Sequence, residues 1–178
     1  MRLALTTITI LMAVLFPGTA QANQPAPIHC KIYASLFPHT KVEHYESCMW
    51  WRVRHIGTHY RHLAHPTVKQ TKFIICSYWK TPAGCRAAWI VAWKESSFYW
   101  GSTNGQYCSV YQMGDSERTN YGANPCHHGG NNIRGAFRYW CGGKVHGRCQ
   151  TRSWGPWQCK PYPGDGCKSV PSWVTSRP

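Results

Sequence analysis

Hydrophobic and polar positions along the chain follow helical rather than strand periodicity. Residues 43–63 place a set of apolar side chains near one helical face, and Pro66 closes that segment. A second helix is predicted over residues 81–97, because Thr81 is a favourable N-cap and Pro82 suits the first turn. The apolar face of the first segment comprises Cys48, Trp51, Ile56, Tyr60 and Leu63.

Shorter segments complete the predicted organisation. Residues 133–140 indicate another helix, ended by Gly142 and Gly143. Residues 73–79 are apolar, but the stretch is too short to separate a helical turn from a strand. Glycine and asparagine are frequent over residues 99–130, so loops and short helical turns are expected there. The predicted class is therefore mainly α, with irregular structure held by disulfides.

The first residues have the pattern of a secretory signal peptide. Arg2 is charged, residues 3–16 are apolar, and small residues at Ala20 and Ala22 fit a cleavage site. The apolar stretch is shorter than the ~20 residues that a membrane-spanning helix needs. We therefore expect a secreted or extracytoplasmic protein, cleaved after Ala22, whose mature chain begins at Asn23.

Composition constrains the compartment and the partners. All ten cysteines follow the predicted signal. An even count behind an export signal indicates disulfides, here five whose pairing the sequence alone does not assign. Lysine and arginine outnumber acidic residues by 20 to 6, so the formal net charge is +14. This charge favours anionic wall polymers, a membrane surface or nucleic acid as partners, although no recognisable nucleic-acid motif accompanies it.

Glu95 is the strongest candidate for a catalytic residue. It follows the unbroken apolar stretch 87–93 and lies near the end of the predicted 81–97 helix. Small and apolar residues three, four and seven positions earlier share its helical face. Burial beside the core and the negative end of the helix dipole would both raise the pKa of the Glu95 carboxyl, as a general acid requires. An exposed, solvated glutamate is the alternative that spacing leaves open.

An ordered set of short motifs runs from Glu95 toward the C-terminus. It comprises Glu-Ser-Ser-Phe at 95–98, Asn-Gly-Gln-Tyr at 104–107, Tyr-Gln-Met-Gly at 111–114, Ser-Glu-Arg at 116–118, Tyr-Gly at 121–122, Ala-Phe-Arg-Tyr-Trp at 136–140 and Trp-Gly-Pro-Trp-Gln-Cys at 154–159. This order resembles the lysozyme-like family of lytic transglycosylases, and more closely its small secreted actinobacterial branch. The resemblance covers residues 75–160. One departure is Ser109-Val110, where the family has glycine and leucine.

The resemblance implies a lysozyme-like domain that cleaves peptidoglycan glycan strands without a cofactor or metal. Glu95 would protonate the glycosidic oxygen between N-acetylmuramic acid and N-acetylglucosamine. It would then act as base while the substrate's own hydroxyl closes a 1,6-anhydro ring. Gln112 would bond an N-acetyl or peptide carbonyl, and Trp100 would stack on a sugar. The candidate substrate-binding residues are Gln112, Tyr111, Trp100, Asn104, Gln106 and Tyr139.

Asp115 and Glu117 decide whether an ordinary hydrolase is an alternative. Such an enzyme needs a second carboxylate ~5–10 Å from the first. The two residues are the nearby candidates in sequence. We favour a structural role for them, with Asp115 or Ser116 capping a short helix and Glu117 in its first turn.

Histidines recur on the first predicted helix. His55, His59 and His62 fall on one side, with His65 beyond, so a zinc or copper site is geometrically possible. We favour a basic, pH-responsive face that binds an anionic wall or membrane, because cationic neighbours disfavour a metal ion. Those neighbours are Arg52, Arg54 and Arg61.

The predicted domain organisation follows from these patterns. It comprises a signal peptide (1–22), a basic helical extension rich in histidine and aromatic residues (23–72), a lysozyme-like transglycosylase domain (73–160) and a Pro/Gly/Ser-rich tail (161–178). The leading hypothesis is an exported peptidoglycan-cleaving enzyme. The alternatives are a lysozyme-type hydrolase and a non-catalytic cationic module that binds cell wall or membrane on the same scaffold. A secreted nuclease or nucleic-acid-binding protein is a weaker hypothesis.

Overall fold

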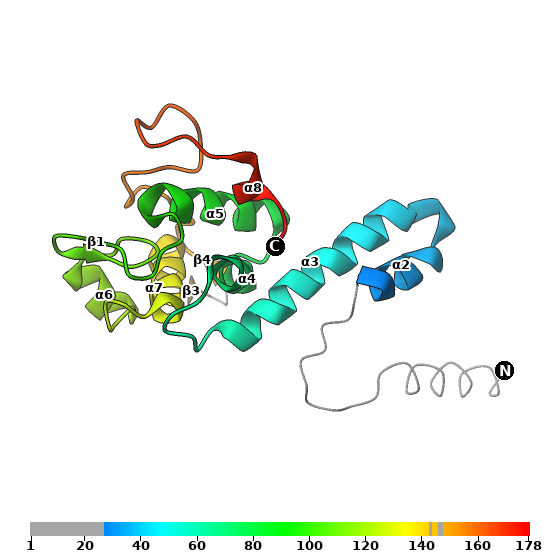
Figure 1. Cartoon of the computed structure of the whole chain (residues 1–178), viewed down its shortest axis with the longest axis horizontal. Helices are drawn as coiled ribbons and strands as arrows, with labels where there is room; N and C mark the ends of the chain where they lie inside the picture. Colours follow the sequence, from blue (N-terminus) through cyan, green and yellow to red (C-terminus); the bar gives the residue numbers. More distant parts are fainter. Residues whose placement is uncertain (1–26, 143, 146–147) are drawn as a thin grey trace.

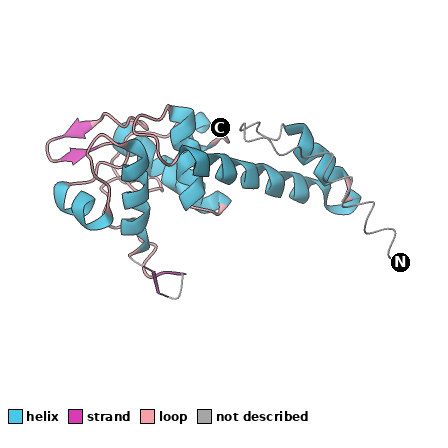
Figure 2. Cartoon of the chain, turned by 90° about the horizontal axis from the view of Figure 1, so that it is seen from below, coloured by secondary structure: helices cyan, strands magenta, loops and turns pink. Residues whose placement is uncertain are grey.

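A computed structural model describes residues 27–142, 144–145 and 148–178, and the predicted signal peptide lies outside them (Figure 1). The described part is mainly helical, as predicted, and its strands form antiparallel two-residue pairs (Figure 2). None of its helices has the length and hydropathy of a membrane span. The elements are α2 (Pro27–Ser35), the 3₁₀ turn η1 (Pro38–Thr40), α3 (Lys41–Tyr60), α4 (Val68–Tyr78), α5 (Pro82–Ser96), β1 (Thr103–Asn104), β2 (Tyr107–Cys108), α6 (Asp115–Tyr121), α7 (Gly129–Cys141), β3 (Lys144–Val145), β4 (Arg148–Cys149) and α8 (Ser172–Thr175).

The C-terminal part of the long helix α3 packs against α4, and its N-terminal part projects from the helical body, where α2 folds back along it (Figure 1). A disulfide between Cys30 and Cys48 joins α2 to α3. The predicted buried face of α3 was wrong by one residue at its centre. Trp50 is buried against Trp89 of α5, whereas Trp51 is 50% exposed. Helical periodicity identified an apolar stripe, but only packing decides which of two adjacent tryptophans faces the core.

Residues 73–79, which the sequence left undecided, belong to the helix α4. Thr67 and Gln70 form a reciprocal capping box at its start. The predicted boundary between residues 72 and 73 therefore falls inside a continuous helix. The backbones of α3 and α4 meet at Gly57, where a Cβ atom would lie 1.9 Å from the Phe73 carbonyl oxygen. This close approach fixes α3 against the rest of the protein.

Helix α5 passes through the core and ends at the candidate site. It begins as predicted, with the Thr81 side chain accepting a hydrogen bond from the Gly84 N–H and Pro82 in the first turn. Ala88, Trp89, Val91 and Ala92 in its middle are fully buried, and Trp89 donates its indole N–H to the Lys72 carbonyl. Ser97 then adopts the left-handed conformation, with φ 58°, and ends the helix directly after Glu95 and Ser96.

All ten cysteines form disulfides, which confirms the expected five bridges. Each bridge joins two consecutive cysteines of the chain, so each closes a short local loop. Five disulfides indicate an extracellular or otherwise oxidising environment. The pairs are Cys30–Cys48, Cys76–Cys85, Cys108–Cys126, Cys141–Cys149 and Cys159–Cys167.

The predicted C-terminal tail packs on the helical body. Val174 of α8 is fully buried, and the Trp173 ring meets Trp93 of α5 edge-on at 5.0 Å. Lys72 of α4 donates hydrogen bonds to the carbonyls of Trp173 and Ser176. Residues 161–178 are therefore part of the folded structure, despite their composition.

Candidate functional site

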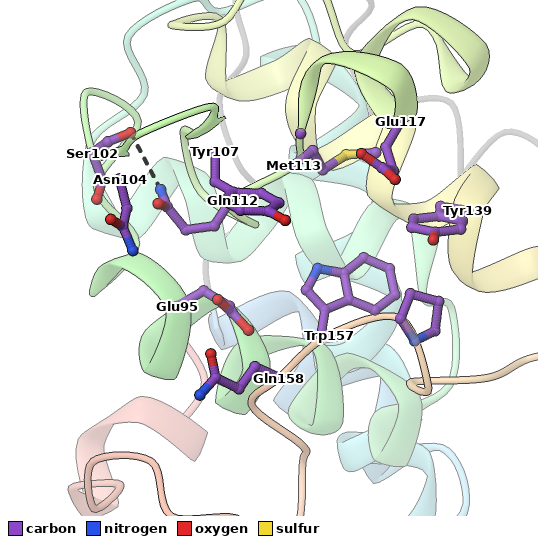
Figure 3. A pocket seen from close by; sticks show the side chains of 12 residues that line it. Glu95, Ser102, Asn104, Tyr107, Gln112, Met113, Glu117, Tyr139, Trp157 and Gln158 are labelled. Carbon is purple, nitrogen blue, oxygen red and sulfur yellow. Dashed lines mark hydrogen bonds between the residues drawn. The ribbon is translucent and has the colours of Figure 1, made fainter.

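A pocket of about 380 Å³ opens at the end of α5 (Figure 3). Its walls come from α5, the β1–β2 hairpin, the start of α6, the end of α7 and residues 156–158. Four of the predicted site residues line this pocket together: Glu95, Asn104, Gln112 and Tyr139. Segments up to 63 residues apart in sequence thus supply one site.

Glu95 is half-buried, and its carboxylate points into the pocket (Figure 3). Its Oε1 accepts a hydrogen bond from the Cys159 N–H at 3.2 Å. Burial raises the pKa of the Glu95 carboxyl, while the Cys159 N–H and the positive charges of Lys160 and Lys168 oppose the rise. The net effect is a carboxyl that holds its proton to higher pH than an exposed glutamate does.

Ser96 fixes the position of the helix end that carries Glu95. Its buried hydroxyl donates to the Val110 carbonyl at 2.8 Å. The segment 108–111, which contains Val110, is also held by α7. The Asn132 side chain accepts a hydrogen bond from the Tyr111 N–H and donates one to the Cys108 carbonyl. The catalytic candidate and the opposite wall of the pocket are therefore tied together by buried hydrogen bonds.

The loop that provides the Cys159 N–H is anchored by a buried ion pair. Lys94 and Asp165 lie 2.7 Å apart, with side chains only 4% and 5% exposed. Asp165 also accepts from the backbone N–H groups of Lys160 and Cys167. The hydrogen bond from Lys94 is the main reason that the pKa of Asp165 falls to about 2. Lys94, the residue before Glu95, thus holds the loop in place.

Lys160 stabilises the other half of this loop. Its ammonium group donates to the carbonyls of Trp154, Gly155 and Trp157. Trp157 is buried and forms a wall of the pocket, and its indole N–H donates to the Tyr111 carbonyl at 3.0 Å. The loop therefore presents a rigid aromatic surface beside Glu95.

Gln112 lies across the pocket from Glu95 (Figure 3). Its backbone is in the left-handed region, with φ 45°. Its side-chain amide donates to the carbonyls of Ser102 at 3.2 Å and Ser109 at 2.7 Å. Both donors are used, and within the described residues no group donates to its Oε1. The side chain is therefore held with an acceptor available to a ligand.

Three predicted substrate-binding residues do not line the pocket. Tyr111 is fully buried beneath it and donates its hydroxyl to the Ala88 carbonyl, and burial raises its pKa well above the usual value. Trp100 stacks on His65 at 3.9 Å instead. Gln106 is exposed on the β1–β2 turn, and its carbonyl accepts from Arg118. Neighbours in sequence can point to opposite sides of a loop, which motif spacing alone does not resolve.

Glu117 was expected to have only a structural role in α6, but its side chain also faces the pocket. It lies in the first turn of α6 as expected, and its side chain lines the pocket on the far side of Trp157 from Glu95 (Figure 3). Burial first, and then the Glu117 charge, raise the pKa of Tyr139. Asp115 instead faces solvent and pairs with Arg118. The predicted side-chain cap is wrong, since Gly114 is the N-cap.

Other pocket residues were not predicted as ligand contacts. Trp157 and Met113 are buried, and each contributes one side to the pocket. Their motifs, 154–159 and 111–114, were the available signal. The remaining contacts are Ser102, Tyr107, Gly114, Pro156 and Gln158. All of these except Ser102 belong to the motifs at 104–107, 111–114 and 154–159, but the motifs did not show which of their side chains face the pocket.

Of the predicted histidine face, His55 and His59 lie on α3, whereas His62 and His65 follow the end of that helix at Tyr60. His55 and His59 are exposed and their Nε2 atoms lie 3.5 Å apart. In the described part of the chain, the only group of three potential metal ligands within 4.8 Å of one another is Cys159, Asp165 and Cys167. Both of those cysteines are in a disulfide, so that group lacks the thiolates a metal would need.

Comparison with known proteins identifies no relative. No protein-family model, no curated protein and no solved structure matches the chain. Functional inference therefore rests on the pocket and on the order of the motifs.

Proposed function

We propose that the protein is an exported peptidoglycan-cleaving enzyme, a lytic transglycosylase on a lysozyme-like scaffold, with Glu95 as its acid and base. The observation that carries this proposal is the setting of Glu95. It is a half-buried carboxyl of raised pKa, at the end of a core helix, in a pocket with Gln112 and Trp157. A protonated carboxyl facing polar and aromatic walls has the chemistry needed to cleave a glycosidic bond.

The two oxygens of Glu95 would have separate tasks. Oε1 accepts the Cys159 N–H, which leaves Oε2 as the oxygen that carries the proton. That proton passes to the glycosidic oxygen as the bond from C1 of N-acetylmuramic acid breaks. The ionised carboxylate then removes the proton of the sugar's C6 hydroxyl while its oxygen bonds to C1. The products are a 1,6-anhydro end and a free hydroxyl on the leaving strand, and Glu95 regains its proton.

The pocket walls suit a chain of N-acetylated sugars. The free Oε1 of Gln112 can accept from an acetamido N–H, and Asn104 offers a further polar contact at the mouth. Tyr107 and Trp157 supply flat apolar surfaces on which a pyranose ring can stack. Tyr139 adds a hydroxyl at the end of the pocket nearest Glu117.

A lysozyme-type hydrolase is the second candidate, and Glu117 is the observation that favours it. Its carboxylate lines the same pocket from α6. A second carboxylate can activate water or stabilise a positive sugar centre, so the product would be a reducing end. We favour the transglycosylase because one carboxyl of raised pKa suffices for it.

Release of soluble fragments from purified peptidoglycan tests the proposal. Glu95→Gln removes the transferable proton while keeping the size of the side chain, so release should fall by about 10²- to 10⁴-fold. Glu43→Gln, at an exposed glutamate of α3, is the matched control and should retain activity. Unchanged release by Glu95→Gln contradicts both candidates. Wall binding without release, by wild type and variant alike, indicates the non-catalytic module instead.

A further inference from the structure

Two histidines on the exposed face of α3 have the geometry of a metal-binding pair. Their Nε2 atoms lie 3.5 Å apart, and the rings meet edge-on at 84°. A tetrahedral ion with metal–nitrogen bonds of 2.0–2.1 Å holds its ligand nitrogens about 3.4 Å apart. We propose that His55 and His59 bind a divalent late first-row metal ion, zinc or copper, with their Nε2 atoms.

The ion would replace a proton between the two rings. Neutral imidazoles at this separation can share one Nε2–H, which one ring donates and the other accepts. A metal ion accepts a lone pair from each Nε2, so the ring that carried the Nε2–H takes a proton from water at Nδ1 as it loses the one at Nε2, and both imidazoles stay neutral. Two of the four positions on a tetrahedral ion are then filled, and water can occupy the exposed remainder.

Neighbouring structure holds the pair in place. Trp51 stacks on His55, with ring centres 4.9 Å apart and planes within 8°. The backbone between the histidines is fixed where Gly57 contacts α4. Because His55 and His59 are four residues apart on a helix held in place, their two imidazoles lie on the same helical face and can bind one ion. Less side-chain and backbone freedom is then lost when an ion binds.

Cationic neighbours were the main objection to a metal on this face, and the structure weakens it, because each of the three arginines has a partner other than the histidines. Arg54 turns away to donate to the Lys80 carbonyl. Arg61 donates to Ser77 and lies over the Tyr78 ring. Arg52 lies three residues before His55, but its side chain is buried and donates to the Met49 sulfur one turn earlier on the helix. The Arg54 and Arg61 guanidinium groups are therefore held by α4 and the residues that follow it, and the Arg52 guanidinium by Met49.

Calorimetric titration of the untagged protein with zinc chloride tests the site. Wild type should bind one zinc ion per chain at this site. His55→Ala or His59→Ala should weaken the zinc affinity by at least about tenfold, because losing a direct metal ligand costs more affinity than losing a residue that only contacts a ligand. His39→Ala removes another exposed histidine and should leave the affinity within about twofold. Equal affinity in all four proteins, or an equal loss in His39→Ala, overturns the proposal.

Thermal unfolding provides a second, independent measurement. Without metal, His55→Ala should unfold at the wild-type temperature, because the side chain is exposed. Added zinc should raise the midpoint of wild type, since an ion that binds only the folded helix stabilises it. The same shift in His55→Ala contradicts the proposal, and its absence supports it.

Discussion

The pocket at the end of α5 and the exposed face of α3 carry reactive side chains in opposite environments. Glu95 is half-buried, so its surroundings raise the pKa of its carboxyl. His55 and His59 are exposed, so their reactivity depends on the distance between them. Burial tunes a single group for proton transfer, whereas pairing on a rigid surface creates a ligand set. The two proposals therefore rest on different physical features, burial at Glu95 and the separation of two nitrogen atoms on α3.

Two adjacent tryptophans of α3 test the contrast between core and surface most strongly. Trp50 is 6% exposed and stacks on Trp89, so Trp50→Ala should destabilise the protein by about 3–5 kcal/mol. Trp51 is 50% exposed, and Trp51→Ala should have an effect below about 1 kcal/mol. Chemical denaturation of both variants measures this difference. Equal losses would show that the exposed face is also structural.

Loss of the Lys94–Asp165 ion pair, which anchors the pocket loop, should lower the cleavage rate more than it lowers the affinity for peptidoglycan. Lys94→Met leaves Asp165 without its main partner and releases the loop that provides the Cys159 N–H. We expect fragment release to fall by about tenfold or more, because small misplacements in an active site have large effects on rate. Lys69→Met changes an exposed lysine and is the control. Full activity in Lys94→Met means that the loop does not position Glu95.

Acid should weaken the same anchor. The pKa of Asp165 is about 2 in the folded protein and 3.8 for the ordinary group, so the folded state favours its ionised form. The resulting stabilisation is complete above about pH 4 and is lost as pH falls toward about 2. The difference in melting temperature between wild type and Asp165→Asn should shrink over that window. A difference that stays constant with pH contradicts this account, and Asp115→Asn at the solvent-exposed pair should change less.

The smallest expected effect concerns the charge near Glu95. Lys168 donates to Ser97 and its positive charge lowers the pKa of Glu95. Lys168→Met should therefore raise the pKa of Glu95 further. Because a general acid must be protonated, the alkaline decline of the rate should move to higher pH. A pH–rate profile measures the shift, and movement to lower pH is the contradictory result.

Local signals in the sequence predicted much of the helical fold. Thr81 and Pro82 marked the start of α5, and the end of α7 falls at Gly142 as expected. The choice between Trp50 and Trp51 required knowledge of packing, because both lie near the apolar stripe. Residues 161–178 have no hydrophobic periodicity. The sequence pattern therefore did not predict that Trp173 packs on α5 or that Asp165 pairs with Lys94.

The residues that line the pocket were also predicted only in part, because local patterns do not show which side chains face it. Glu95 and Gln112 follow from a helix end and a motif, and both line the pocket. Tyr111 was expected to line the pocket and does not, whereas Glu117 was expected to be structural and does line it. The backbone turn at Gln112, with φ 45°, and the start of α6 set which of these side chains face the pocket. Such turns depend on tertiary contacts rather than on spacing.

Mass spectrometry of peptidoglycan digests tests the central proposal most directly. Wild type and Glu117→Gln should both release fragments ending in 1,6-anhydro-N-acetylmuramic acid, since ring closure needs only Glu95. Glu95→Gln should release neither anhydro nor reducing fragments. Reducing ends from wild type that disappear in Glu117→Gln would contradict transglycosylation and establish a two-carboxylate hydrolase in the same pocket.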